Sequence, residues 1–585
     1  MRLKKVGLGA LSLLLCLGLS ACSVEQATST DLGTKVDLSD LQTEADVHIR
    51  DKNLLYDMYD NTEIVTMYLT VSSGNEAEGT DHTWEEVNTY SAYDYDRMGV
   101  DRYKVAGLLQ VGDKNGLIPG ELGFGQVAPN CTVQIRGQSS SRNPQKNYKI
   151  SIKDNKGDWR GQTTIALNKH QGDGLRFRNK MAFDLLAGVD ELMSLRTTFV
   201  RLFVKDTTAG GNGKFQDYGI YTQVEQLNKT ALKAHGLDNR GHLYKVNFCE
   251  FYEYEDIIVK KDDPRYDLKK FEEILEIKGD DDHTKLIEML KKVNDYSIPI
   301  EEILDEHFDL ENIAYWMAFQ LMVGNVDTQS RNFYLYSPQN IDRWYILPWD
   351  MDGMLSRTQY KLTGRTDYEE WESGVSNYWG NVLFQRCLKS ETYRKALDDA
   401  VNDIKEYLSK ERVDSYVKTY AKLLKPYIYS GRDLIYTRLT AAQYDKVANS
   451  INAEIADNYV RYKESLEKPM PFYIGAPQKK GDGYTVEWES SYDFGGEDVT
   501  YTFELARDYH FRNPIVKQTD LRIPTASFGK LRAGQYFMRV KAQNESGKTQ
   551  VAFDYYILEL GKVYGTKCFY IDRNGKVTED VYVES

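Results

Sequence analysis

Four polar residues near the middle of the chain could together handle a phosphate group and its metal ion. Asp327 and Asn332 lie in a polar loop, and Asp350 and Asp352 follow a turn and a short apolar run. Carboxylate and amide oxygens bind Mg2+, and a carboxylate on rigid backbone can orient a hydroxyl that attacks a phosphoryl group. The pattern therefore indicates metal-assisted phosphoryl transfer, although two acidic residues after a strand are more often a solvated turn.

A second group of candidates lies upstream, where a loop of small residues joins two predicted strands. Residues 136–149 read RGQSSSRNPQKNYK, with Lys146 and Lys149 after the serines. A Gly- and Ser-rich turn can surround a phosphate with backbone N–H groups, and a nearby ammonium can neutralise its charge. The same pattern also fits an ordinary hairpin whose turn faces water.

Periodicity indicates which elements position these groups. Alternation of apolar and polar residues predicts strands, and three-and-four spacing predicts helices. The strand pattern covers residues 63–72, 103–111, 131–136, 197–204 and 218–224, and the helical pattern covers 268–277, 285–293, 310–323 and 383–466. We therefore expect an α+β fold in which a sheet-rich half precedes a helical half, with the acidic loop following the helix at 310–323.

Four blocks in this order together resemble the spore-coat CotH kinase family. They are residues 135–150, residues 178–179, residues 218–225 with 243–245, and residues 324–352. The resemblance spans residues 47–467 and implies a two-lobed, atypical protein-kinase-like domain. Two positions depart from the family pattern, because Thr328 follows Asp327 where the family often has an aromatic residue, and Gln145 replaces one of two lysines.

The resemblance implies that ATP and Mg2+ or Mn2+ are used to phosphorylate Ser or Thr in secreted or surface proteins. Asp327 would be the catalytic residue, and Asn332, Asp350 and Asp352 would bind the metal. The residues that would contact the nucleotide are Lys146, Arg136, Ser139 and Glu225. The alternative is a catalytically inactive, kinase-like surface binding protein or adhesin, since ATP is scarce outside the cell.

The N-terminus predicts export and a lipid anchor. Basic residues at positions 2, 4 and 5 precede an apolar run over 6–19, and residues 19–22 (LSAC) resemble a lipoprotein cleavage site. We expect residues 1–22 to be a signal peptide, Cys22 to be lipidated, and residues 23–46 to form a flexible tether. The protein would then face outward from the bacterial cell membrane.

The last part of the chain predicts a second domain, as expected for 585 residues. Prolines at 469 and 471 mark a linker, and regularly spaced alternating segments follow. Residues 484–488 and 531–542 resemble a fibronectin type III domain. We expect residues 468–585 to form an all-β immunoglobulin/fibronectin-like sandwich that folds alone and serves as a spacer, with substrate capture as the alternative.

The net charge and the cysteine spacing argue against nucleic acid as a partner and against a zinc site. The formal net charge of −14 argues against nucleic acid, because phosphate backbones require a basic face. The cysteines at 131, 249, 387 and 568 include no C-x-x-C pair, so no zinc site is indicated.

Overall fold

The computed structural model describes residues 48–49, 51, 53–56, 62–364, 371–559 and 561–580. The expected signal peptide, the lipidation site at Cys22 and the expected tether lie outside the described residues. Among the described helices, none combines the length and apolar character of a bilayer span. The cysteines at 131, 249, 387 and 568 are buried free thiols.

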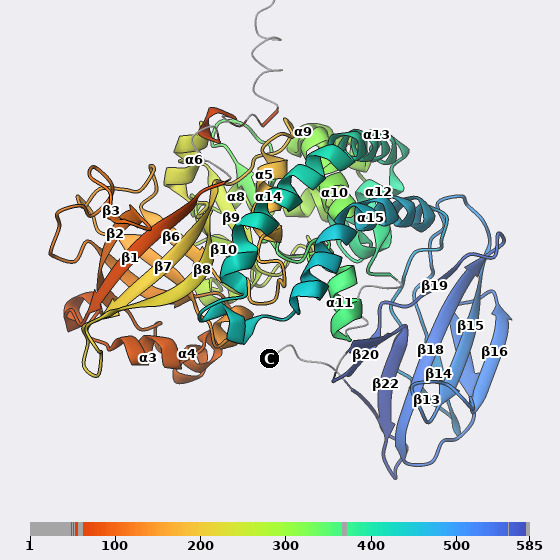
Figure 1. Ribbon diagram of the computed structural model, residues 1–585. Coiled ribbons are helices and arrows are strands. Elements are labelled where there is room, and N and C mark those ends of the chain that lie inside the picture. Colours follow the sequence, from red (N-terminus) through yellow and green to blue (C-terminus); the bar gives the residue numbers. More distant parts are fainter. Residues whose placement is uncertain are drawn as a thin grey trace, which may run out of the picture. The chain divides into compact units, whose positions relative to one another are not determined.

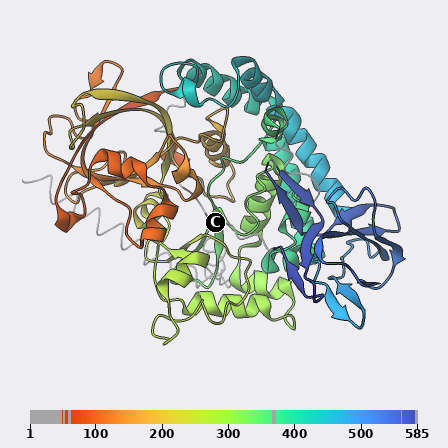
Figure 2. The same ribbon diagram turned by 90° about the horizontal axis from the view of Figure 1, so that it is seen from below.

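The first half of the described chain is dominated by an eight-stranded sheet that closes on itself (Figures 1 and 2). Its strands run in the order β1 (Ile64–Ser72), β7 (Thr197–Asp206), β8 (Phe215–Glu225), β6 (Thr164–Asn168), β5 (Asn147–Ile152), β4 (Cys131–Arg136), β2 (Val105–Asp113) and β3 (Gly116–Leu117). Strand β2 also pairs with β1, which closes the ring and leaves the two-residue β3 as a branch on β2. In Figure 2 the orange to yellow strands curve around this ring.

Side-chain alternation separates the two faces of the closed sheet. In β4 and β5 the buried residues Ile135, Tyr148 and Ile150 belong to the core that the sheet encloses. Arg136 and Lys149 occupy the alternate positions and are half-buried. Because side chains alternate with a period of two, both point away from the enclosed core.

A second sheet and a buried helix position the acidic loop. The sheet has the order β10 (Leu275–Ile277), β9 (His242–Val246), β11 (Phe333–Ser337) and β12 (Tyr345–Pro348). Helix α10 (Leu310–Val323) ends at Gly324, whose φ of 60° suits a residue without a side chain. The antiparallel register pairs Phe333 with Pro348, so Asn332 and Asp350 leave the sheet at the same end.

Helices fill the rest of the second half, as the periodicity predicts. They include α12 (Val382–Lys389), α13 (Glu391–Tyr407), α14 (Lys410–Ile428) and α15 (Ala441–Leu466). Helix α10 contacts both α13 and α15, and its buried residues include Trp316, Met317 and Phe319. The acidic loop therefore starts from the interior of a packed helical layer.

Beyond Leu466 the described elements are strands. One sheet contains β13 (Gln478–Lys480), β14 (Gly483–Glu487) and β17 (Thr525–Phe528), and the other contains β16 (Val516–Leu521), β15 (Val499–Ala506), β18 (Gly534–Asn544), β22 (Thr566–Ile571) and β23 (Val577–Glu579). Between β18 and β22 lie β19 (Thr549–Val551) and the hairpin of β20 (Tyr555–Leu558) and β21 (Gly561–Tyr564). We call residues 468–580 the C-terminal β module.

The C-terminal β module shares its packing with the helical half. Phe553 belongs to the main hydrophobic core, and its ring centroid lies 5.2 Å from that of Trp371. Trp379 likewise stacks on Tyr492 at 5.3 Å. From Ile49 onward the chain forms one compact unit.

Candidate active site

The four polar residues that the sequence singles out lie along one pocket. Asp327, Asn332, Asp350 and Asp352 all line a cavity of about 730 Å³. We call this cavity the acidic pocket. The loop after α10 supplies the first two residues, and the segment after β12 supplies the other two.

Asn332 holds the Asp327 carboxylate in place. The Asn332 Nδ2 donates to the backbone oxygen of Asp327 at 2.9 Å and to its Oδ2 at 3.0 Å. Asn332 has a φ of 62°, a left-handed conformation that Asn tolerates better than most residues. The Asp327 side chain remains 63% exposed. Asn332 therefore orients it, Arg331 Nε lies 3.8 Å from its Oδ1, and its exposed part can meet a ligand.

Asp350 and Asp352 are two carboxyls with opposite electrostatic surroundings. Burial, together with the charge of Asp352, raises the pKa of Asp350 to about 7. Reduced solvation would also raise the pKa of Asp352, but a hydrogen bond with His170 and the charge of Arg178 lower it below the usual value. Because two negative charges this close repel each other, one carboxyl tends to keep its proton, and a bound cation would remove that tendency.

His170 orients Asp352 in a way that the sequence does not indicate. Its Nδ1 lies 3.1 Å from Asp352 Oδ2, and its Nε2 accepts from Asn179 Nδ2 at 3.0 Å. The Asn179 Oδ1 in turn accepts from the backbone N–H of Met351 at 3.1 Å. Asn179 comes from helix α5 (Arg178–Leu186), so this chain of hydrogen bonds ties the segment after β12 to α5.

The donors around the acidic pocket fit a hard divalent cation. The Oδ1 of Asn325, which also lines the pocket, is buried without a hydrogen-bond partner in the part of the chain described. No three His, Cys, Asp or Glu side chains converge among the described residues. Mg2+ and Mn2+ bind through one or two carboxylates when phosphate and water oxygens complete the coordination. The two aspartates with nearby amide oxygens provide such a set.

Cations gather around Glu276. Lys245 Nζ lies 3.7 Å from the Glu276 carboxylate, which also pairs with Lys278. Burial and the like charge of Lys278 lower the pKa of Lys149. Arg136 reaches the same region, because its guanidinium lies 6.0 Å from the ring centroid of Trp349, the residue before Asp350, and donates to Asn168 Oδ1. We call Arg136, Lys149, Lys245 and Lys278 the cation cluster. One carboxylate, Glu276, offsets only part of its charge, so it favours an anionic ligand.

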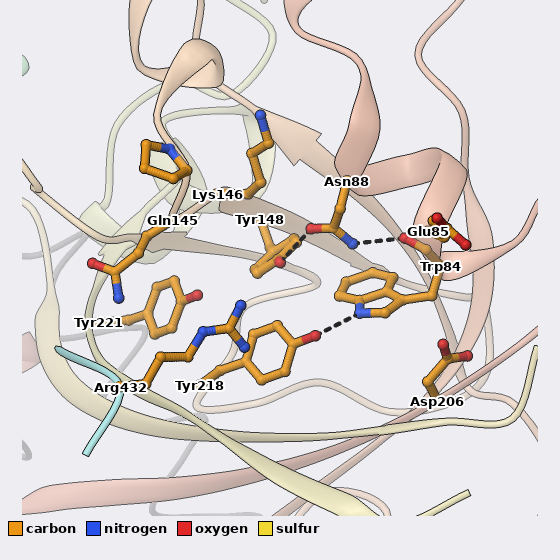
Figure 3. Close-up of a pocket in the computed structure, with 11 residues that line it drawn as sticks. Trp84, Glu85, Asn88, Gln145, Lys146, Tyr148, Asp206, Tyr218, Tyr221 and Arg432 are labelled. Atoms are coloured by element: carbon orange, nitrogen blue, oxygen red, sulfur yellow. Dashed lines mark hydrogen bonds between the residues drawn. The ribbon is translucent and has the colours of Figure 1, made fainter. Parts of the chain in front are cut away.

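Lys146 lies in a different cavity (Figure 3). This cavity of about 240 Å³ is lined by the rings of Trp84, Tyr148, Tyr218 and Tyr221. The Lys146 ammonium donates to the backbone oxygen of Ser141 at 2.6 Å. Lys146 precedes β5, so its own loop holds its ammonium. The structure does not bring Lys146 to the acidic pocket.

Other predicted nucleotide contacts also lie elsewhere. Ser139 is exposed in a short 3-10 turn and lines neither cavity. Glu225 is buried at the end of β8, where it accepts from Arg196 Nε at 3.0 Å and contacts His235 Nε2 at 3.0 Å. These contacts attach β8 to α6 (Lys229–His235) and leave Glu225 in a structural ion pair. Of the predicted nucleotide group, Arg136 alone lies near the acidic residues.

The chain is similar in sequence to known proteins. The family model described as "CotH kinase protein" matches residues 133–461. Inner spore coat protein H of Bacillus subtilis (strain 168) is 25% identical over 286 residues, which are 48% of this chain and 72% of that protein.

A solved structure, the twitchin kinase region from C. elegans (Fn31-NL-kin-CRD-Ig26), matches at 22% identity and a TM-score of 0.12. That match covers 16% of this chain and spans only 20% of the twitchin chain. Because the TM-score is so low, the match carries no argument about fold.

Proposed function

Because the chain belongs to the CotH kinase family, we propose that it transfers the γ-phosphate of ATP to Ser or Thr hydroxyls of secreted or surface proteins. The family match over residues 133–461 includes the four polar residues of the acidic pocket that the sequence singles out. The observation that carries the proposal is the arrangement of that pocket. An oriented, exposed carboxylate and two metal-binding carboxyls share one cavity. Arg136, from the cation cluster, lies 6.0 Å from the ring centroid of Trp349, the residue before Asp350.

Asp327 acts on the acceptor hydroxyl. Its carboxylate faces the pocket, and Asn332 fixes its position through two hydrogen bonds. A carboxylate so placed orients the hydroxyl and takes its proton while the phosphoryl group transfers. Asn332 thereby acts on the acceptor side as well as supplying an amide oxygen to the metal side.

Asp350 and Asp352 hold Mg2+ or Mn2+, with Asn325 and Asn332 as further oxygen donors. When bound, the metal neutralises the phosphate oxygens of the nucleotide. His170 keeps the Asp352 carboxylate ionised and aimed, since it hydrogen-bonds Oδ2 and is itself held by Asn179. Second-sphere contacts of this kind set the orientation of a metal ligand.

The cation cluster binds the nucleotide phosphates. We assign these contacts to Arg136, Lys149 and Lys245 in place of Lys146, Ser139 and Glu225. The reason is strand alternation, because Lys149 points away from the core enclosed by the closed sheet. Lys146 is held by the Ser141 carbonyl beside a different cavity.

The remaining architecture and location are part of the same proposal. The closed sheet and the helical half would be the two lobes of the kinase-like domain, and the C-terminal β module would be a fibronectin type III-like sandwich. Its strand order and the Tyr536 hydroxyl, which donates to the Arg532 backbone oxygen at 2.7 Å, support that likeness. Lipidation at Cys22 would anchor the protein on the cell surface. The spore-coat name of the B. subtilis relative fits a surface location.

The test is phosphate transfer by the mature, full-length chain. Labelled ATP with Mg2+ or Mn2+ should label an acceptor protein, and nucleotide should stabilise the chain only with metal present, by about 2.7 kcal/mol at 100 times Kd. Lys149→Ala should weaken nucleotide binding at least tenfold, whereas Lys153→Ala, which removes a pair with Glu78, should not. Metal-dependent nucleotide binding without any transfer would favour the inactive binding protein. If adding nucleotide together with metal leaves the stability of the chain unchanged, the proposal is contradicted.

A further inference from the structure

One wall of the acidic pocket comes from the C-terminal β module. Tyr473, Phe553, Tyr555 and Lys562 line the same cavity as Asp327 and the two metal-binding aspartates. Tyr473 lies in the segment that enters the module, and the other three lie between β18 and β22. Residues at the far end of the sequence therefore border the residues proposed to perform the chemistry.

Specific contacts fix this wall in place. Lys562 Nζ and the Tyr564 hydroxyl both donate to the Glu372 carboxylate at 2.6 Å. The Lys562 ammonium also lies 4.5 Å from the centroid of the Tyr555 ring. The Glu372 side chain is only 9% exposed, so the ion pair is shielded from water. An adventitious surface contact would not bury a carboxylate to this extent and give it two donors.

The wall leaves aromatic surface open to a ligand. Tyr473 is 45% exposed and Phe248, on another side of the pocket, is 41% exposed. Exposed aromatic rings grouped around a functional cavity are typical of a docking surface. Phe553 is 7% exposed and serves as support for the neighbouring rings.

The same pocket contains an unused hydrogen-bond acceptor. Asn377 is 3% exposed, and its Oδ1 has no hydrogen-bond partner among the described residues, while its Nδ2 donates to the Val326 oxygen at 2.9 Å. A buried acceptor without a donor costs about 1–3 kcal/mol unless a ligand supplies one. An extended peptide carries backbone N–H groups that can do so.

We infer that the C-terminal β module forms the acceptor-binding wall of the active pocket. The partner is an extended peptide segment of the substrate protein in which an aromatic or large aliphatic side chain adjoins the phosphorylated hydroxyl. That side chain packs against Tyr473 and Tyr555, and a peptide N–H donates to Asn377. This inference rests on the proposed kinase function and adds the acceptor specificity of the same site.

Two peptides test the inference with the full-length mature chain, ATP and Mg2+. One contains a single Ser flanked by Phe on both sides within glycines, and the other has Gly in place of both Phe. We expect KM for the first peptide to be at least tenfold lower. Tyr473→Ala and Tyr555→Ala should each remove most of this preference. Tyr473→Phe keeps the ring and should therefore retain the preference. Tyr570→Ala is the matched control, because Tyr570 is 43% exposed in the same module and does not line the pocket.

Binding without turnover gives a second readout. In the Asp327→Asn background, fluorescence anisotropy of the labelled peptides should show the same tenfold difference, and the two Tyr→Ala variants should abolish it. If nucleotide binds with metal but both peptides bind and react alike, or neither peptide binds, the inference about the module is overturned and the kinase proposal stands. If nucleotide does not bind the unsubstituted chain, the kinase proposal fails and the acceptor assignment fails with it.

Discussion

Asp327 and Asp352 share one pocket but have different neighbours, and this difference predicts different mutant behaviour. Asp327→Asn removes the proton acceptor and leaves the metal-binding carboxyls in place. Transfer should fall on the order of 100-fold or more, while metal-dependent nucleotide binding remains within a few-fold. Single-turnover transfer and nucleotide titration measure the two quantities. Asp305→Asn, on an exposed helix position, is the control. Loss of nucleotide binding in Asp327→Asn would place this residue on the metal side.

His170 should act through Asp352. His170→Ala removes the hydrogen bond to Oδ2 and the partner of Asn179, so the carboxylate loses its orientation. Outer-sphere changes of this kind typically cost 10- to 100-fold in metal affinity. We expect Mn2+ affinity, measured by titration, to fall in that range, and His510→Ala at an exposed site of the module to have no effect. Asp352→Ala should lose metal and nucleotide binding altogether. Equal affinities in His170→Ala and the unsubstituted chain would contradict the assignment.

The sequence predicts part of this site and not the rest, for physical reasons. Asp327, Asn332, Asp350 and Asp352 are found because they flank two strands that pair locally. His170 lies 182 positions from Asp352, and no local pattern connects them. Lys146 and Lys149 are equally basic in sequence. Lys146 precedes β5 and Lys149 lies within it on the face away from the enclosed core, a difference that matters only once the sheet defines an interior.

At the level of elements, one buried ion-pair network joins β8, α6 and the start of the described chain. His235 contacts Glu225 at 3.0 Å and Asp51 at 2.5 Å. Burial would lower the pKa of His235, but the hydrogen bonds and charges of Asp51 and Glu225 raise it to about 9. The stability that this protonated His contributes is therefore complete below about pH 6.5, its ordinary pKa, and is lost as the pH rises through 9.

We accordingly expect His235→Gln to reduce the free energy of unfolding more at pH 6 than at pH 9.5. The difference between the two pH values should be on the order of 3 kcal/mol at most. Denaturant unfolding at several pH values measures it. Comparison with the unsubstituted chain is essential, because Lys169, whose pKa burial lowers to about 8, acts in the opposite sense. A constant difference between variant and unsubstituted chain across this range would show that folding does not raise the pKa of His235.

Element types follow from periodicity, but closure of the sheet does not. The predicted strands at 131–136 and 197–204 and the predicted helix at 310–323 all form. Closure depends on β1 pairing with β7 in parallel and with β2 in antiparallel, as in Ile64 with Phe199. Such pairings join residues far apart in the chain, and alternation of apolar residues fixes the face of a strand but not its neighbours.

For the whole molecule, the prolines near 470 mark where helices give way to strands, but packing continues across them. Phe553 and Val551 belong to the core of the helical half. The Gln550 side chain donates to the Ser376 hydroxyl at 3.2 Å, and Asn544 donates to the Glu467 backbone oxygen at 3.1 Å. These contacts favour mutual stabilisation of the two parts, and their independent folding stays a prediction.

A chain that ends at Glu467 should be less stable than the full-length protein. Truncation uncovers Trp371 and Trp379, which pack against Phe553 and Tyr492. Within the full chain, Phe553→Ala alone should lower the free energy of unfolding by about 3–5 kcal/mol, as for other buried Phe side chains. Ile523→Ala, at a side chain 68% exposed, is the control and should have little effect. Calorimetry should show one transition for the full chain and a lower melting temperature, or aggregation, for the truncated one. A truncated chain with an unchanged melting temperature and unchanged metal-dependent nucleotide binding would show that the module is an independent domain after all.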